Sequence, residues 1–261
     1  MKNIAAKLLA LALPLAASSF GASAQEARST TGGGSTNIQL FYDFGADRQI
    51  VTATLEGFYN DPWGNTFFFI DTDFGTSVKA PLGAYCEIAR CFNFWKDTPM
   101  GFLSLQAEYN GGRYSDYGIN HAFLAGADFF VHSADYRNCF NFKLLYKHIL
   151  YSTPVSGTVP LQFTFVWGMK NLFGVKGLAF SGFADFWGER HSLFTGTDGQ
   201  PLPAPEESSF VFLSEPQLWY GVGSLFGCDN LNIGGEVELS WDFGACKGFH
   251  CRPCAGIKWI F

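Results

Sequence analysis

In several short stretches of this chain, carboxylates and aromatic residues lie two positions apart. Asp71 and Asp73 follow Phe69 at this spacing, and Trp187 follows Asp185. Residues two apart lie on the same face of a β-strand, so each stretch presents flat rings beside hydrogen-bond acceptors. Rings stack on flat ligand groups and carboxylates accept hydrogen bonds from hydroxyls, so this combination suits a small hydrophilic solute that contains a ring.

The same parity assigns a larger set of residues to one polar face, which we expect to line the interior of the protein. The candidate solute-contacting residues are Glu56, Phe67, Phe69, Asp71, Asp73, Glu87, Glu108, Phe183, Asp185, Trp187 and Glu215. The cations on this face are fewer, namely Lys143, Lys147, Lys170 and Lys258. In the alternative interpretation, the rings fill a narrow interior and the carboxylates pair with the lysines in a structural network.

Seven cysteines supply another set of reactive side chains. Their odd number leaves at least one of them unpaired. The segment from Cys246 to Cys254 superficially resembles a metal knot, but zinc usually needs two Cys-x-x-Cys pairs, so we expect neither a metal nor a cofactor. A disulfide from Cys246 to Cys251 or Cys254 stays open as an alternative, because the sequence does not give the geometry.

His191 and Ser192 are the most suggestive catalytic neighbours in the chain. However, no histidine lies at a spacing from a serine and an acid that singles out a catalytic set, and a triad is recognised only in space. We therefore expect that the protein is not an enzyme. An outer-membrane lipid-modifying enzyme is a minor alternative, which would need a serine and a histidine within hydrogen-bond reach on the outer wall.

The residues above lie in twelve segments whose hydrophobicity alternates with a period of two. A tilted membrane strand needs about 9–11 residues, which is the typical length of these segments. They are Asn37–Gly45, Gln49–Tyr59, Asn65–Gly75, Gly83–Trp95, Gly101–Asn110, Tyr117–Val131, Cys139–Ile149, Val159–Leu172, Gly177–Trp187, Ser209–Tyr220, Ile233–Phe243 and Phe249–Phe261.

This pattern predicts an all-β fold, a closed antiparallel transmembrane β-barrel of about 12 strands with both termini periplasmic. The apolar half of each strand would face lipid and the polar half a lumen. Closure follows because an unpaired strand edge cannot lie in hydrocarbon. The longest gap, Gly188–Ser208, is expected to form an external loop. Arg90 shares parity with the apolar face, so either a bulge shifts the register or its side chain snorkels to the interface.

The composition agrees with a membrane barrel. The chain of 261 residues is 48% hydrophobic, 18% aromatic and 15% charged. After residue 24 it has no run of about 18 uninterrupted apolar residues, which excludes a helical membrane protein. The formal net charge of −6 argues against nucleic acid as a partner, because nucleic-acid binding proteins present basic surfaces.

The first residues have the features of a secretory signal peptide. Met1–Ala24 has a cationic start, a short apolar stretch and an Ala-Ser-Ala ending, so we expect cleavage between Ala24 and Gln25. Residues 25–36 are rich in Ser, Thr and Gly and are expected to form a flexible leader. Residues 37–261 then form a single barrel domain in the bacterial outer membrane.

The last strand ends with alternating aromatic residues and a terminal Phe. Gly256, Trp259 and Phe261 resemble the C-terminal signal that outer-membrane barrels present to the barrel assembly machinery. Aromatic residues near other strand ends suit the girdles at the two membrane interfaces, namely Tyr42, Tyr59, Trp63, Trp95, Tyr109, Tyr220 and Trp259. We therefore expect outer-membrane lipid and this machinery as partners.

Four stretches resemble the nucleoside-specific outer-membrane channels (Tsx-like), namely Thr54–Tyr59, Phe67–Asp73, Tyr85–Arg90 and Phe180–Trp187. The chain resembles more closely an outer-membrane barrel family of unknown function. That second resemblance spans essentially the whole mature chain and includes Phe210–Gln217. Together they imply a twelve-stranded fold more firmly than a substrate.

Two functions follow as hypotheses. The first is an outer-membrane channel or facilitator for passive diffusion of small hydrophilic solutes, with nucleosides implied by the resemblance. The second is a closed structural, receptor or adhesive barrel without transport activity, in which external loops bind a partner.

Overall fold

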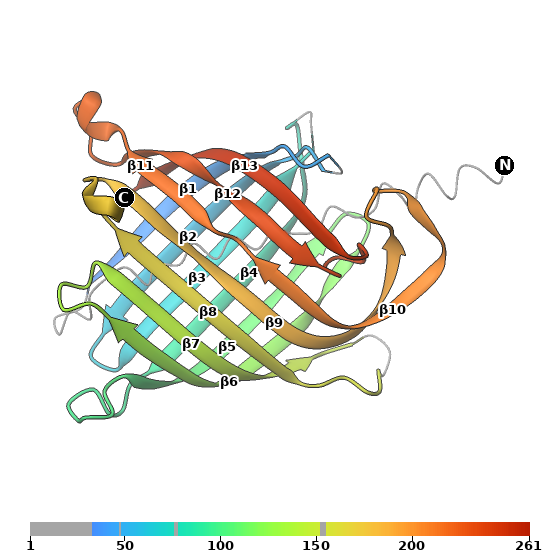
Figure 1. Cartoon of the computed structure of the whole chain (residues 1–261), viewed down its shortest axis with the longest axis horizontal. Helices are drawn as coiled ribbons and strands as arrows, with labels where there is room; N and C mark the ends of the chain where they lie inside the picture. The colour runs from blue at the N-terminus through green and yellow to red at the C-terminus, as the bar shows by residue number, and fades with distance from the viewer. Residues whose placement is uncertain (1–32, 47, 76–77, 152–154) are drawn as a thin grey trace.

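A computed structural model of the chain describes residues 33–46, 48–75, 78–151 and 155–261 (Figure 1). The predicted signal peptide with its cleavage site, and residues 25–32 of the predicted leader, lie outside these ranges. The strands are β1 (Gly33–Asp43), β2 (Val51–Asp61), β3 (Gly64–Phe74), β4 (Pro81–Phe92), β5 (Leu103–Tyr114), β6 (Gly118–His132), β7 (Asn138–Ile149), β8 (Leu161–Lys170), β9 (Leu178–Thr195), β10 (Pro201–Ser214), β11 (Gln217–Gly221), β12 (Leu231–Trp241) and β13 (Phe249–Ile260). Two short 3-10 helices, η1 (Leu172–Gly174) and η2 (Gly223–Leu225), lie in connections.

These strands form one closed antiparallel barrel with twelve strand positions. Apart from β10 and β11, strands that are neighbours in sequence pair with each other, and β1 closes the ring by pairing with β13 from Asn37↔Ile260 to Asp43↔Cys254. β10 and β11 share one position, because both pair with β9 and with β12. Pro216 lies at the break between them and cannot donate to the ladder. The predicted twelve-stranded barrel is therefore confirmed.

The barrel has two distinct ends. Gly33 of β1 and Ile260 of β13 lie at one, which we call the terminal end. The β1–β2, β5–β6, β9–β10 and β12–β13 connections lie at the other, which we call the distal end. β1 begins at Gly33, four residues before the predicted segment, so Gly33–Thr36 pair with β2.

The segment Gly188–Ser208, expected as a loop, is instead largely a β-hairpin. β9 continues to Thr195 and β10 begins at Pro201, and their residues pair as far as Pro201↔Thr195 with two register shifts. The prolines of this segment are tolerated because β10 pairs with β12 only from Phe212 to Ser214, and because Pro203 and Pro205 lie in the register shift between Pro201 and Glu206 on the β9 side. In Figure 1 the hairpin reaches beyond the barrel wall at the distal end.

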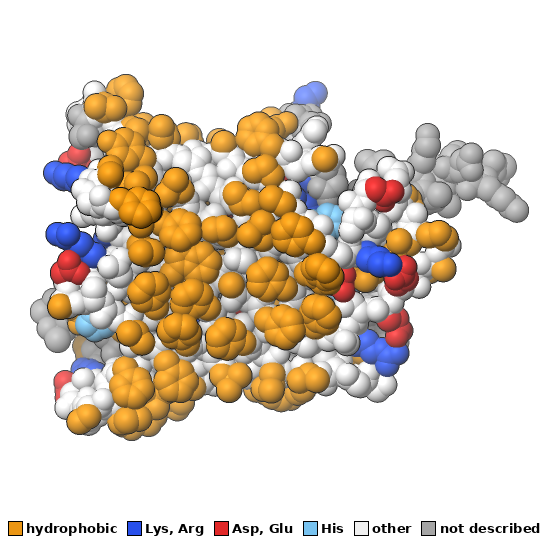
Figure 2. Space-filling view, in the orientation of Figure 1, with side chains coloured by type: hydrophobic (Ala, Val, Ile, Leu, Met, Phe, Trp, Pro, Cys, Tyr) orange, Lys and Arg blue, Asp and Glu red, His pale blue; other side chains and the backbone are white. Residues whose placement is uncertain are grey.

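The outer wall is apolar over its middle, and Figure 2 shows charged side chains gathered at the two ends. Leu144 on β7 and Phe163 on β8 are examples of exposed large side chains, at 54% and 47%. Such a belt on a closed barrel is the arrangement of outer-membrane proteins. No helix among the described residues is long and apolar enough to cross a membrane.

Arg90 is a charged residue whose parity places it on the apolar outer face of the barrel. The β3–β4 ladder is regular around it, so no bulge turns its side chain inward. Its guanidinium instead reaches the β2–β3 turn, where it forms an ion pair with Asp61 at 2.7 Å and donates to Thr66 at 3.0 Å. The predicted snorkelling to the barrel end is therefore the arrangement observed.

Candidate functional site

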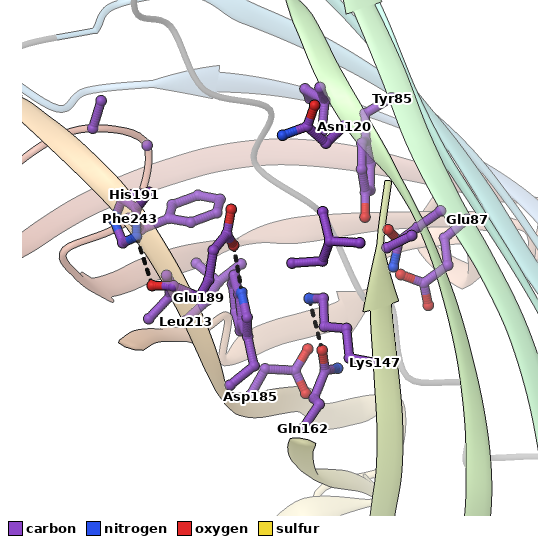
Figure 3. Close-up of a pocket in the computed structure, with 18 of the residues that line it drawn as sticks. Tyr85, Glu87, Asn120, Lys147, Gln162, Asp185, Glu189, His191, Leu213 and Phe243 are labelled. Carbon is purple, nitrogen blue, oxygen red and sulfur yellow. Dashed lines mark hydrogen bonds between the residues drawn. The ribbon is translucent and has the colours of Figure 1, made fainter. Parts of the chain in front are cut away.

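A cavity of about 280 Å³ opens inside the barrel near its distal end (Figure 3). Its walls come from β4 to β10, and from the β5–β6 and β12–β13 connections. We call this space the distal cavity. Its apolar lining includes Tyr85, Ile149, Trp187, Val211, Leu213 and Phe243. Its polar lining includes Glu87, Asn110, Asn120, Lys147, Gln162, Asp185, Glu189 and His191.

One lysine and three carboxylates give this cavity its charge. The Lys147 ammonium group donates to Gln162 Oε1 at 2.9 Å and lies 4.0 Å from the centre of the Trp187 ring. The Trp187 indole donates to Glu189 Oε2 at 2.7 Å. Within the described part of the chain, Glu87 Oε1 and Asp185 Oδ1 are buried without a hydrogen-bond partner. The cavity is therefore acidic, with two unused acceptor atoms in its lining residues.

An apolar cluster forms the inner boundary of the distal cavity. We call it the lumen cluster, and its buried members are Phe69, Val166, Phe183, Trp187, Val211 and Leu213. Phe69 belongs to β3, whereas the other members belong to β8, β9 and β10. Because β3 and β9 lie on opposite walls, this cluster spans the barrel interior. Phe69 and Phe183 have no exposed surface, so the lumen is filled with side chains at this level.

A second cavity, of about 340 Å³, lies at the terminal end. It is bounded by the β2–β3 turn, the β4–β5 connection and the β6–β7 turn, with Asn60, Phe130 and Tyr136 among its lining residues. The barrel therefore has a cavity near each end, and the lumen cluster borders the distal one. None of the predicted solute-contacting residues lines this second cavity.

A buried ion-pair network closes part of the distal end. Arg48 from the β1–β2 connection pairs with Asp43 on β1 and lies 2.9 Å from Glu238 on β12. Arg252 on β13 pairs with the other oxygen of Glu238 and donates to Ser240 at 3.3 Å. The four charged side chains are at most 4% exposed, so the network is shielded from solvent.

Every predicted solute-contacting residue lies inside the barrel, but most are already engaged there. Ten are buried, and Phe67 packs against the lumen cluster. Asp71 accepts from Thr54 at 2.6 Å, and Asp73 accepts from Thr52 at 2.6 Å and from Tyr114 at 2.8 Å. Glu56 and Glu108 likewise accept from inner-wall amides, at 2.8 Å and 2.6 Å. Only Glu87, Asp185 and Trp187 of this set line the distal cavity.

Several cavity residues were missed by the sequence reasoning. Glu189 and His191 continue the inward parity of Asp185 and Trp187. The predicted strand ended at Trp187, so this signal was not used for the two residues. Asn120 has the inward parity of Ala122 and Leu124, so the predicted segment Tyr117–Val131 already contained its signal. Phe243 has the parity of outward-facing Trp241, but β12 ends at Trp241 and the Phe243 side chain packs against the lumen cluster.

The cysteines and His191 were the other candidates for reactive chemistry. No disulfide links any of the seven cysteines, all of which lie in the described part of the chain, so the disulfide considered for Cys246 is not formed. Both ring nitrogens of His191 lie against backbone carbonyls, those of Glu189 at 3.0 Å and Asp242 at 2.7 Å. His191 is therefore held to the backbone rather than to Ser192. The absence of enzyme activity remains an expectation.

Comparison with known proteins identifies a family but no activity. No curated protein matches the chain in sequence. A KdgM porin in complex with disordered oligogalacturonate has a TM-score of 0.45 and 10% identity, over 87% of this chain and 99% of that one. OprD of Pseudomonas aeruginosa has a TM-score of 0.37 and 10% identity, over 92% and 97%. Residues 35–261 match the family described as a domain of unknown function (DUF5020), and the chain therefore belongs to this family.

Proposed function

We propose that the protein is an outer-membrane channel for small hydrophilic solutes, with a lumen that is closed at the lumen cluster in the form described. The arrangement of the two cavities carries this proposal. They lie at opposite ends of one barrel, and the lumen cluster that borders the distal cavity packs across the interior through side chains rather than through backbone. Side chains change rotamers far more readily than a β-ladder breaks, so the barrier is one that can move. Apolar constrictions of this kind gate channels by excluding water.

Nucleosides are the more specific substrate that the sequence resemblance implied. The ring-and-carboxylate pairs at Phe69 and Asp71 are buried and engaged with other residues. Trp187 and Asp185, by contrast, line the distal cavity together. Any stacking of a base in this form of the channel is therefore proposed at Trp187, with Asp185 Oδ1 as an acceptor for a hydroxyl.

Solute uptake into proteoliposomes tests the channel. The purified protein is reconstituted into vesicles, and entry of labelled uridine and of a small neutral sugar is measured against vesicles without protein. For passive diffusion, the proposal expects the initial rate of uptake to rise with the solute concentration and to need no energy source. A barrel that inserts fully but transports neither solute contradicts it.

A closed barrel without transport is the second candidate, and the lumen cluster is the observation that favours it. If its packing is permanent, the distal hairpin of β9 and β10 becomes the natural contact surface, since it projects beyond the wall (Figure 1). If Phe69→Ala with Phe183→Ala, which shortens two side chains of the cluster, still gives no uptake, the closed barrel is selected.

A further inference from the structure

From the chemistry of the distal cavity we infer that it binds a compact monocationic solute, a primary amine attached to an apolar body. This rests on the proposed channel, because it names the class of solute that the distal cavity admits. The first support is the balance of charge. Glu87, Asp185 and Glu189 line the cavity, and Lys147 is the one lysine or arginine among its described lining residues. Net negative charge in a low-dielectric pocket favours a cation.

The second support is the state of these carboxylates. Glu87 is 3% exposed and Asp185 is 5% exposed, and each has an oxygen without a partner in the described part of the structure. A buried acceptor that stays unsatisfied costs free energy, so a donor placed there by a ligand is stabilising. An ammonium group has three donors and no acceptor, which suits two carboxylate oxygens.

Lys147 does not occupy that place. Its ammonium group is held by Gln162 at 2.9 Å and by the Trp187 ring, and no carboxylate oxygen forms an ion pair with it within the described residues. Lys147 therefore offsets part of the negative charge of the cavity but leaves Glu87 Oε1 and Asp185 Oδ1 without a hydrogen-bond donor. Its positive charge also opposes a ligand cation, so removing that charge strengthens amine binding.

The third support is the apolar lining. Trp187, Val211 and Leu213 are shared with the lumen cluster, and Phe243 lies on the same side of the cavity (Figure 3). These side chains offer dispersion contacts and no hydrogen-bonding groups beyond the indole N–H, which Glu189 already accepts. A ligand that carries its charge at one end and an aryl or alkyl group at the other matches both halves of the cavity.

Isothermal titration calorimetry on the purified full-length protein in detergent tests this inference with three matched probes. They are 2-phenylethylamine, the neutral 2-phenylethanol and the anionic phenylacetate, each corrected for binding to empty micelles. The inference expects the amine to bind more tightly than the alcohol by about tenfold or more, as one or two charge-assisted hydrogen bonds provide. The anion should bind least. Equal affinities for amine and alcohol, or a preference for phenylacetate, would overturn the inference.

Variants assign the effect to the cavity. E87Q combined with D185N is expected to abolish the preference for the amine, whereas K147M is expected to increase it. The control is D128N, because Asp128 is an equally buried carboxylate that does not line the cavity and is engaged with Asn141 at 2.8 Å. Amine binding that weakens in K147M, or a preference for the amine that persists in the double variant, would overturn the inference.

Binding and transport fail separately. Calorimetry does not need an open lumen, so amine binding without uptake would remove the channel and leave the ligand class standing. Uptake of neutral solutes without amine binding would remove the ligand class and leave the channel.

Discussion

Phe69 and Phe183 lie in one buried apolar cluster although their strands, β3 and β9, stand on opposite walls of the barrel. Five strand positions separate the two strands in either direction around the ring. Contact across the lumen therefore comes from side chains alone. The inner wall of the barrel is polar, as in a channel, but the side chains of this cluster leave no open space at its level.

The buried ion-pair network predicts a large effect of one distal residue on stability. Arg48→Met leaves Asp43 and Glu238 without their shared cation, and breaking a buried ion pair costs about 3–5 kcal/mol. Urea unfolding of the barrel from lipid vesicles measures this change. The matched control is Arg190→Met, whose exposed pair with Glu207 contributes about 0–1 kcal/mol. Similar losses in both variants would contradict the assignment.

The apolar outer belt predicts a cost that depends on position along the wall. Leu144→Arg places a charge near the middle of β7 facing lipid, which costs about 2–4 kcal/mol. Phe194→Arg lies in the distal hairpin and should cost less than about 1 kcal/mol. Folding free energies in vesicles compare the two. A smaller cost at Leu144 than at Phe194 would show that the membrane does not surround the middle of the barrel.

The inner wall predicts a preference for cations. Among the described residues, twelve carboxylates are buried in the barrel, namely Asp43, Glu56, Asp71, Asp73, Glu87, Glu108, Asp128, Asp185, Glu215, Glu236, Glu238 and Asp242. Fewer basic side chains accompany them. Excess negative charge along a low-dielectric wall concentrates cations. Reversal potentials across a potassium chloride gradient should therefore favour potassium over chloride, and Glu87→Gln with Asp185→Asn should reduce this preference. A preference for chloride would contradict the charge argument.

The final residue predicts a separation between stability and assembly. Phe261 is 70% exposed, and its backbone N–H donates to Thr36 at 2.9 Å whatever its side chain. Phe261→Ala should therefore leave the unfolding midpoint unchanged. If Gly256, Trp259 and Phe261 form an assembly signal, the same variant should insert more slowly in vesicles that contain the barrel assembly machinery. Equal rates would remove that role.

The alternation of polar and apolar residues accounts for most of what the sequence predicts about this fold. Glu236 and Glu238 alternate with Val237 and Leu239, and the structure buries both carboxylates. A period of two reports which way each side chain faces, so strand count, closure and the inner acids were predictable. Strand ends were less so, since the prolines of Gly188–Ser208 are typical of a loop but here lie on a strand paired on one side.

The candidate site was harder to predict because it depends on contacts across the lumen. Parity placed Phe69 and Phe183 inside but gave no sign that they pack in one cluster, since that depends on the diameter of the barrel and on the rotamers of its side chains. Arg48 lies outside any strand, so nothing in its spacing indicated that it folds inward onto Glu238. The free oxygens of Glu87 and Asp185 are likewise a property of three-dimensional packing.

Conductance across a planar bilayer tests the central claim most directly, that the lumen cluster closes an otherwise continuous channel. The comparison is between the wild-type protein and Phe69→Ala with Phe183→Ala, with the outward-facing Phe163→Ala as the control. Circular dichroism and resistance to unfolding by detergent first establish that each variant is folded. We predict brief, small current steps for the wild type and the control, and larger, longer-lived steps for the double variant. A folded, inserted double variant that conducts no more than the wild type would contradict the account.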